Sequence, residues 1–513
     1  MIPRKGDPGT MNSSNSGNSR EIVIIGGGIG GLSASIRLQA AGHNVTLLEK
    51  RNQLGGRAGV LTKNGYTFDT GPTILTPPYL VDEVFEAAGR KRQDYIDLVQ
   101  ISPKYRLYFN DGTHMDYAGY EHNLEEIKRF NEEDVEGYKK FIKQIKPIYE
   151  LGFEKFGSTT FPSLWSMAKM GPAGIRYKAY KSVYGMVSSY LKDERMRMGL
   201  SFNPLFIGGN PFTATAIYCL ITYIEEKHGV WWVKGGTHRM IEAMADVFTE
   251  IGGNIKLNSE VTHVSVTGDK EIEGVETGDG NYYPADIVIS NADVARTYMD
   301  LIDEKYRKKN SDKRYKKAKY SMSLFMVYFG VKKKYPDMEQ HSIVFGPRYK
   351  GLINDIFKNH EVPDDFSTYL HIPTRNNPEL APEGCEAMYA CTPVSHLEAD
   401  VDWEEKKEPF KDHILATLDE RVLPGLLDNL DVVEVFTPAD FKAELNAYKG
   451  SAFSLQPLLL QSGYFRPHNR SRDIKGLYLV GAGTHPGAGV PSVMMSADIT
   501  SSLIQEDIAE GKI

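Results

Sequence analysis

The 513-residue sequence has few cysteines, no long apolar run and no excess of positive charge. Its three cysteines exclude a disulfide-linked scaffold, so we expect a reducing compartment. Without a stretch of about 18 consecutive apolar residues it has no candidate for a membrane-spanning helix, which leaves attachment to a membrane surface open. Lys and Arg number 60 against 67 Asp and Glu, and this net charge of −7 argues against a general nucleic-acid binder.

The first 20 residues are polar, rich in Gly, Ser and Asn, and lack the apolar core of a secretory signal. We expect residues 1–20 to form a disordered tail. Beyond them the composition is that of an ordinary globular protein, with 41% apolar and 25% charged residues. A chain of this length is expected to hold roughly two to four domains.

A glycine-rich turn between two apolar segments is the first feature that points to a ligand. The β-branched run at residues 22–25 indicates a buried parallel strand, and residues 32–41 have the apolar spacing of a helix. Between them, Gly26, Gly28 and Gly31 match the dinucleotide pattern G-x-G-x-x-G in the strand–turn–helix context that gives it specificity. There the glycines allow the tight turn, the approach of a pyrophosphate and the packing of the helix, whose N-terminus attracts the phosphate charge.

A second strand at residues 45–48 leads to Glu49, 18 positions after Gly31. The Glu49 carboxylate is placed to accept hydrogen bonds from ribose hydroxyls, and its charge disfavours the 2′-phosphate of NADP. The alternative is a structural glycine turn that binds nothing. We favour the dinucleotide site because strand, turn, helix and acid occur together within about 30 residues.

Strand signals of the same kind return much later in the chain. They lie at residues 255–266, 274–276, 285–289 and 476–481. A final helix is expected from about residue 493 to residue 508. We infer an α/β fold with a discontinuous Rossmann-like nucleotide-binding domain, built from residues 20–100, 230–300 and 470–513. The remaining segments, 101–229 and 301–469, are expected to form a second region.

A second glycine doublet, Leu54-Gly55-Gly56-Arg57, begins five residues after Glu49. It resembles the doublet of FAD-containing oxidoreductases in the amine-oxidase-like superfamily, where the backbone and an arginine meet the FAD pyrophosphate from the other side. The alternative is an ordinary loop. No second strand-framed G-x-G-x-x-G exists, and the spacing of Cys385 and Cys391 is not that of a CxxC redox pair. We therefore expect electrons to pass from substrate to flavin and then to an external acceptor such as a quinone or oxygen.

Longer blocks of the sequence resemble phytoene desaturases of the bacterial and fungal type. The most specific is Tyr-Leu-Val-Gly-Ala-Gly-Thr-His-Pro-Gly-Ala-Gly-Val-Pro at residues 478–491. Other matching blocks lie at residues 201–212, 229–237, 345–349, 380–385 and 445–454. The resemblance covers nearly the whole chain. It implies FAD as cofactor, a linear C40 polyene (phytoene) as substrate, and a discontinuous Rossmann-like FAD-binding domain with an α+β substrate domain and a helical membrane-associated region.

The resemblance also implies which residues hold FAD. Those expected at its ADP part are Gly26, Gly28, Gly31, Glu49, Gly55, Gly56 and Arg57. The main chain of Val261 would meet the adenine, and Gly483 with the start of the last helix would meet the ribitol and the flavin ring. No metal is expected, because the 13 histidines are scattered and none has metal-ligand spacing with cysteines.

His485 departs from the pattern of related amine oxidases, in which a glutamate follows the corresponding Ala-Gly-Thr. Here His485 follows Ala482-Gly483-Thr484, which argues against amine oxidation and leaves the ribitol partner open. His485 is a candidate catalytic residue. The alternative is a turn histidine that bonds the backbone beside Pro486.

The resemblance favours an oxidoreductase of carotenoid biosynthesis that acts on CH–CH bonds and converts phytoene stepwise to lycopene. Alternatives are a C30 diapophytoene desaturase, a hydroxycarotenoid desaturase or a terminal-methyl oxidase of the same family. An amine or protoporphyrinogen oxidase, and a flavin- or carotenoid-binding protein without turnover, are less favoured. A hydrocarbon substrate needs a long apolar pocket, and the aromatic candidates for its walls are Phe202, Phe206, Phe212, Trp231, Trp232, Phe453, Tyr464 and Phe465.

Residues 156–192 contain no Asp or Glu in a chain that is acidic overall. Their five basic residues are interspersed with Trp165, Leu164, Met170 and other apolar side chains, a composition that suits an anionic membrane surface. The alternative is a solvated helical lid. A second basic run, residues 305–319, has fewer apolar residues and is expected to be a solvated face. We therefore expect a cytoplasmic protein attached peripherally to the inner face of the cell membrane.

Overall fold

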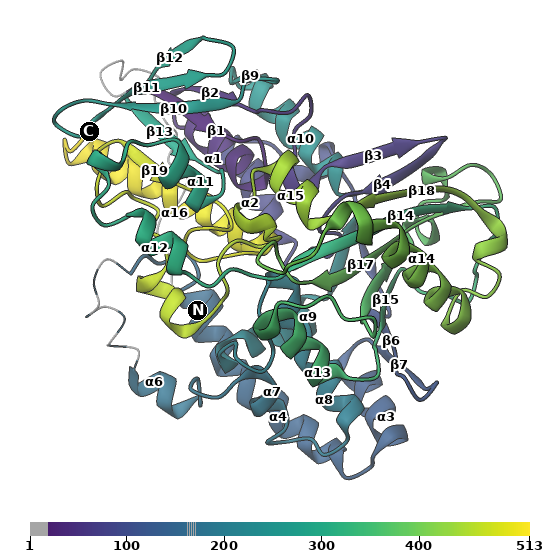
Figure 1. The fold of residues 1–513 in the computed structure, drawn as a ribbon. Helices are drawn as coiled ribbons and strands as arrows, with labels where there is room; N and C mark the ends of the chain where they lie inside the picture. Colours follow the sequence, from purple (N-terminus) through teal and green to yellow (C-terminus); the bar gives the residue numbers. More distant parts are fainter. Residues whose placement is uncertain (1–18, 162, 164, 166, 168, 170) are drawn as a thin grey trace.

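The computed structural model describes residues 19–161, 163, 165, 167, 169 and 171–513 (Figure 1). Most of the tail expected at residues 1–20 therefore lies outside the described residues. No helix among the described residues is both long and apolar enough to cross a membrane.

A parallel five-stranded sheet is assembled from segments that are far apart in the sequence. Its strand order is β19-β13-β1-β2-β9, and every neighbouring pair is parallel. The strands are β1 (Glu21–Ile25), β2 (Asn44–Leu48), β9 (Asn254–Lys256), β13 (Ile287–Ser290) and β19 (Leu477–Leu479). They come from the three segments expected to form the nucleotide-binding domain, whose limits stay a prediction.

Both faces of this sheet are covered, which is why β1 is apolar throughout. Ile22 and Ile24 point into one core, whereas Val23 and Ile25 point into another. The first core contains the helices α1 (Ile29–Ala40), α2 (Tyr79–Ala87), α10 (Thr237–Glu250) and α16 (Val490–Ala509). The second contains the antiparallel sheet of β10 (Val261–Val266), β11 (Ile272–Thr277) and β12 (Tyr282–Pro284), together with α11 (Val294–Asp300).

The local predictions for this part of the fold are confirmed, with shifted boundaries. The first helix begins at Ile29 rather than residue 32, and the last begins at Val490 with Pro491 in its first turn, where proline is tolerated. The strand signal at residues 255–266 divides between β9 and β10, which belong to different sheets.

A mixed seven-stranded sheet forms the other large layer (Figure 1). In sheet order its strands are β18 (Leu430–Phe436), β14 (Ser323–Val331), β17 (Glu386–Val394), β16 (Thr368–His371), β15 (His341–Val344), β6 (Tyr105–Tyr108) and β7 (His114–Tyr117). All neighbours are antiparallel except β15 and β6. Phe325, Val327 and Phe329 of β14 pack against α14 (Trp403–Arg421) on one face.

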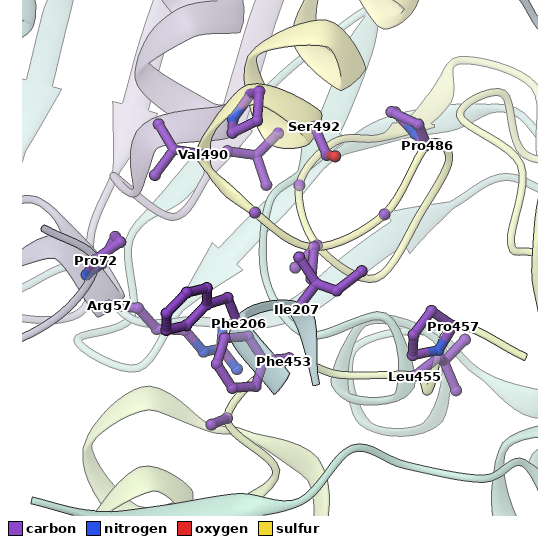
Figure 2. Close-up of a pocket in the computed structure, with 18 of the residues that line it drawn as sticks. Arg57, Pro72, Phe206, Ile207, Phe453, Leu455, Pro457, Pro486, Val490 and Ser492 are labelled. Carbon is purple, nitrogen blue, oxygen red and sulfur yellow. The ribbon is translucent and has the colours of Figure 1, made fainter. Parts of the chain in front are cut away.

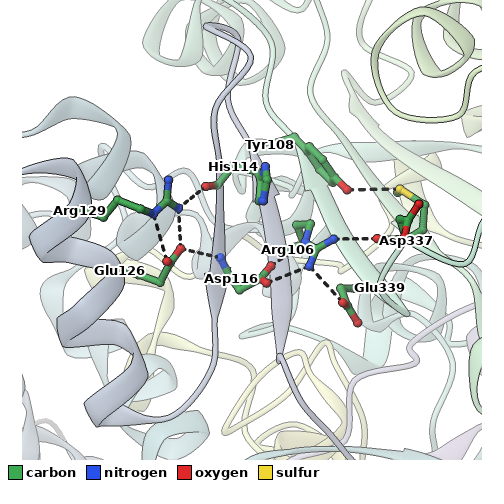
Figure 3. A network of polar contacts seen from close by, with 9 residues as sticks. Arg106, Tyr108, His114, Asp116, Glu126, Arg129, Asp337 and Glu339 are labelled. Carbon is green, nitrogen blue, oxygen red and sulfur yellow. Dashed lines mark hydrogen bonds and ion pairs between the residues drawn. The ribbon is translucent and has the colours of Figure 1, made fainter.

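An ion-pair network fixes the β6–β7 edge of this sheet (Figure 3). Arg106 on β6 donates to both carboxylate oxygens of Asp116 on β7, at 2.6 and 2.8 Å, and to Glu339 at 3.1 Å. Glu126 on α3 (Tyr120–Phe130) accepts from the Asp116 amide and pairs with Arg129. The Arg106–Asp116 contact is bidentate, so it constrains the geometry of the two strands more than a single surface ion pair would.

Helices fill the region below the seven-stranded sheet in Figure 1. They are α4 (Asp134–Tyr149), α6 (Gly171–Arg176), α7 (Val183–Val187), α8 (Glu194–Ser201), α9 (Leu220–His228) and α13 (Tyr349–Asn354). The described residues also form the α-helices α12 (Asp312–Lys317) and α15 (Pro438–Leu445). Two small antiparallel sheets complete the fold: β3 (Val60–Lys63) with β4 (Tyr66–Asp69), and β5 (Leu98–Ile101) with β8 (Val230–Val233).

Candidate functional site

One cavity of about 840 Å³ connects the glycine turn after β1 with the helical region. Its wall includes Gly26 and Gly28 at one end, and Phe202 and Tyr180 from the segments between β7 and β8. In the close-up, Val490 and Pro486 near the start of α16 lie above Phe206 and Phe453 (Figure 2). The carboxyl ends of the parallel strands therefore open into an apolar space, the arrangement in which α/β folds bind ligands.

The glycine turn after β1 and the doublet Gly55-Gly56 meet at the start of α1. Gly28 and Gly55 form an isolated bridge, and the Gly55 amide donates to the Gly27 carbonyl at 2.9 Å. A Cβ on Gly31 would lie 2.1 Å from the Gly26 oxygen, so only glycine fits there. No side chain caps α1 at Gly28, which leaves its first amides available to an anion.

Glu49 is buried at the end of β2 and lines the cavity. Its Oε2 accepts a hydrogen bond from the Gly27 amide at 2.8 Å, and its Oε1 accepts one from the Arg51 amide at 2.9 Å. Each carboxylate oxygen has a second acceptor position, so the group retains capacity for a hydroxyl donor. The carboxylate thus also orders the glycine turn, a role that its sequence position did not reveal.

Arg57 brings a half-buried positive charge to the cavity wall (Figure 2). Its Nη2 donates to the Ser451 carbonyl at 3.4 Å, and its Nε has no partner among the described residues. Burial lowers the pKa of Arg57, whereas nearby Asp293 raises it. Asp293 also lines the cavity, and its Oδ2 is likewise unpaired. An unpaired buried donor beside uncapped helix amides fits the pyrophosphate of a dinucleotide.

The other expected cofactor residues are distributed between the cavity wall and the layer behind it. Gly26, Gly55, Gly56 and Val261, the first residue of β10, line the cavity. Gly483 packs behind the wall, where a Cβ would lie 2.9 Å from Val294, while its neighbour Ala482 lines the cavity.

His485 lines the cavity and its ring bonds to the main chain. Its Nε2 lies 3.0 Å from the Thr159 oxygen, and its ring makes an edge contact with Phe161 at 5.3 Å between centroids. Burial lowers the pKa of His485 to about 4, so the ring is neutral near pH 7 and donates this hydrogen bond from Nε2. The contact agrees with the turn-histidine alternative, and a catalytic role stays a prediction.

The aromatic residues suggested for the pocket divide into two groups. Phe202, Phe206 and Phe453 line the cavity. The prediction is wrong for five others, which do not line it: Phe212, Trp231, Trp232, Tyr464 and Phe465. Trp232, for example, is completely buried in the core beneath β8. Aliphatic side chains from α9, β14 and α13 take their place, among them Ile221, Leu324 and Leu352.

Two residues that sequence reasoning missed stabilise the loops at this site. The Asn291 side chain donates to the Gly26 carbonyl at 3.2 Å and packs beside Gly30 and Gly481. Arg466 is buried and donates to the carbonyls of Thr484 and Ala482, at 2.9 and 2.6 Å. The position of Asn291, two residues after the predicted strand at 285–289, could have identified it, because ligand-binding loops follow the carboxyl ends of parallel strands.

Comparisons with known proteins match nearly the whole chain. The family model described as flavin containing amine oxidoreductase matches residues 29–504. A lycopene-forming phytoene desaturase from Pseudescherichia vulneris is 44% identical over 491 residues, which cover 95% of this chain and 100% of that protein. The chain belongs to the phytoene desaturases of this flavoprotein family.

A second relative gives the same result. The lycopene-forming phytoene desaturase of Pantoea ananas is 43% identical, with coverage of 95% of this chain and 99% of that protein. Among solved structures, putrescine oxidase bound to putrescine is similar with a TM-score of 0.65, at 15% identity and with 96% and 99% coverage. That likeness concerns the fold alone. This desaturase is thus an FAD-dependent oxidoreductase with an amine-oxidase fold.

Proposed function

We propose that this protein dehydrogenates phytoene, a linear C40 polyene, in successive steps to lycopene. The observation that carries the proposal is the continuity of the cavity, which joins a dinucleotide cradle to a long apolar space. A hydrocarbon offers no polar group for a side chain to bind, so shape and apolar contact must position it. FAD supplies the oxidation by accepting a hydride from the substrate.

We propose that FAD binds to the residues around the glycine turn after β1 and the doublet Gly55-Gly56. The backbone at Gly26, Gly28, Gly55 and Gly56, with the amides of α1, holds the pyrophosphate together with Arg57. Glu49 binds the ribose and Val261 meets the adenine. Gly31 and Gly483 act through packing, because each leaves room that a Cβ would fill.

The apolar end of the cavity reaches the segment that we propose attaches to the membrane. Ile175 and Tyr180 line the cavity, yet their side chains are 73% and 70% exposed. Trp165 and Leu460 are similarly exposed, at 72% and 73%. Trp165 lies two residues before the cavity-lining Met167, and Leu460 follows the cavity-lining Leu459. Exposed apolar side chains in and next to the cavity wall suit an interaction site, here for a bilayer that contains the substrate.

The basic residues of this segment support an anionic surface. Lys178 and Lys181 bond only to neutral hydroxyls in the contacts seen here, those of Tyr190 and Ser189. Lys192 differs, because it pairs with Glu133 at 2.7 Å, which offsets its charge. Leu164 and Met170 lie outside the described residues. The bilayer face that this arrangement serves is the cytoplasmic one, where anionic lipids collect.

The deciding experiment mixes the purified FAD-loaded protein with phytoene-containing liposomes under anaerobic conditions, without NADP⁺. Bleaching of the flavin spectrum, followed by extraction of lycopene after a quinone or oxygen is admitted, is the expected result. A parallel sample with a C30 diapophytoene tests the C30 alternative. Phytoene that stays unchanged while the protein retains FAD would instead indicate a binding protein without turnover, and a requirement for NADP⁺ would contradict the single-nucleotide scheme.

A further inference from the structure

Glu225 on α9 places a carboxylate on the apolar part of the cavity wall. It is 1% exposed and lines the cavity together with Ile221 and Ile224 of the same helix. The other acids among the described lining residues are Glu49, Asp293, Glu444 and Glu260, which precedes Val261 in the chain. Glu260 and Glu444 pair with Arg296 and Arg51.

Neutral donors hold the Glu225 carboxylate in place. Its Oε1 accepts from the Tyr105 hydroxyl at 2.8 Å, and its Oε2 accepts from the Asn203 amide at 3.4 Å. Lys104, a cation that interacts with this carboxylate, is bound instead to Glu226 at 3.0 Å, and the ion pairs found among the described residues do not include Glu225. A carboxylate has about four acceptor sites, so two remain beyond these bonds.

The surroundings of Glu225 determine the pKa of its carboxyl group. Burial raises the pKa of Glu225 to about 7, against the opposing effects of Lys104, Tyr105 and Asn203. Glu226 contributes a small further rise, and Tyr117 is the other titratable group that interacts with this carboxyl. Both protonation states are therefore populated near neutral pH, the range in which a general base is most effective.

A pocket for a hydrocarbon gains nothing in affinity from a buried carboxylate, whose desolvation is costly. The dehydrogenation does need an acceptor for a proton. We propose that Glu225 is the catalytic base, with Tyr105 and Asn203 as positioning residues; this rests on the proposed function.

Each dehydrogenation breaks two C–H bonds on adjacent carbons. Each step removes a hydride, which carries two electrons and one hydrogen to FAD, and a proton from the adjacent carbon, which goes to a Glu225 carboxylate oxygen. The electron pair of the second C–H bond becomes the new C=C bond. The proton leaves the carboxyl for solvent when the product departs.

The test measures the single-turnover rate of flavin reduction by liposomal phytoene between pH 5.5 and 9. The parent rate should rise with pH around a midpoint near 7. Glu225→Gln should lower the rate at pH 8 by about 10²-fold or more and remove the pH dependence, with FAD content and melting temperature retained. Glu225→Asp should keep the pH dependence at a reduced rate. Glu386→Gln is the matched control, because Glu386 is a buried glutamate whose pKa is raised by burial but which is not among the lining residues, and it should stay within a few-fold of the parent.

A readout independent of turnover uses the infrared difference spectrum of the parent and Glu225→Gln without FAD. The carbonyl band of a protonated carboxyl should disappear as pH rises through about 7. A flat parent rate profile, or parental rates in Glu225→Gln, overturns the assignment; if that variant fails to fold, the parent profile and Glu225→Asp decide. A parent whose flavin stays oxidised at every pH overturns the proposed function itself, and this inference with it.

Discussion

The carboxylate of Glu49 accepts a hydrogen bond from the amide of Gly27 across 2.8 Å. This bond joins the end of β2 to the turn that follows β1, and a second bond from the Arg51 amide fixes the chain after Glu49. The acid therefore organises the nucleotide loop before any ribose arrives. We therefore expect substitution of Glu49 to lower the stability of the apoprotein as well as its affinity for FAD.

Replacing Glu49 by alanine should weaken both folding and FAD binding. Two amides, those of Gly27 and Arg51, lose their acceptor, and each buried donor left unpaired costs about 1–3 kcal/mol. Denaturant unfolding of the apoprotein and FAD titration measure the two effects separately. Glu49→Gln, which retains one oxygen acceptor, should destabilise the apoprotein less. Unchanged FAD affinity in Glu49→Ala would contradict the ribose contact.

Gly31→Ala should prevent normal packing of α1. The new Cβ would lie 2.1 Å from the Gly26 carbonyl oxygen, and the backbone on both sides is held in the sheet and the helix. We expect a loss of about 3 kcal/mol or more in the free energy of unfolding, the upper range for overpacking. Gly268→Ala, where a Cβ meets nothing within 4 Å, is the control and should change stability by less than about 0.5 kcal/mol. Equal stability of the two variants would contradict the predicted clash at Gly31.

The nucleotide loop could be predicted from sequence because its determinants are local. Gly26, Gly28, Gly31 and Glu49 lie in one strand–turn–helix–strand unit, and short-range geometry dictates their arrangement. Glu225 could not be predicted in the same way. Its burial, its tyrosine partner 120 positions earlier and its place on the cavity wall arise only from the packing of α9 against β6 and neighbouring elements. Composition also overestimated the aromatic lining, because it cannot distinguish a core residue from a wall residue.

The basic segment near the cavity mouth should determine membrane binding. Replacing Lys169, Arg176, Lys178 and Lys181 by Gln removes four positive charges, each worth about 1 kcal/mol at an anionic surface. Sedimentation with anionic liposomes should weaken most at low salt, while the flavin spectrum stays intact. The matched control makes the same charge change in the other basic run, at Lys308, Lys309, Lys313 and Lys317. Parental sedimentation by the first variant would identify its segment as a lid.

Acid should destabilise the fold through buried neutral histidines such as His341. Burial lowers the pKa of His341 to about 3, against about 6.5 for an exposed imidazole. Between these values the unfolded chain binds a proton that the folded chain does not, so the free energy of unfolding falls as pH drops below about 6.5. The slope is at most about 1.4 kcal/mol per pH unit for each such group.

The measurement compares urea unfolding at pH 7 and pH 5.5 in the parent and in His341→Gln. The variant should lose less stability on acidification, because it carries no imidazole to protonate. His263→Gln, at a partly exposed position, serves as control and should follow the parent. Identical acid sensitivity in all three proteins would show that His341 does not contribute.

The parallel sheet also determines when the cofactor can be bound. β1, α1 and β2 leave the ribosome early, yet their neighbours β13, β19 and α16 lie hundreds of residues downstream. Pairings of such high contact order form slowly and leave apolar surface exposed until they are made. The nascent chain thus carries an unfinished nucleotide fold throughout most of translation. We therefore expect FAD to bind only after the C-terminal segments have been synthesised, because β13, β19 and α16 complete the sheet and helix layer beside its site.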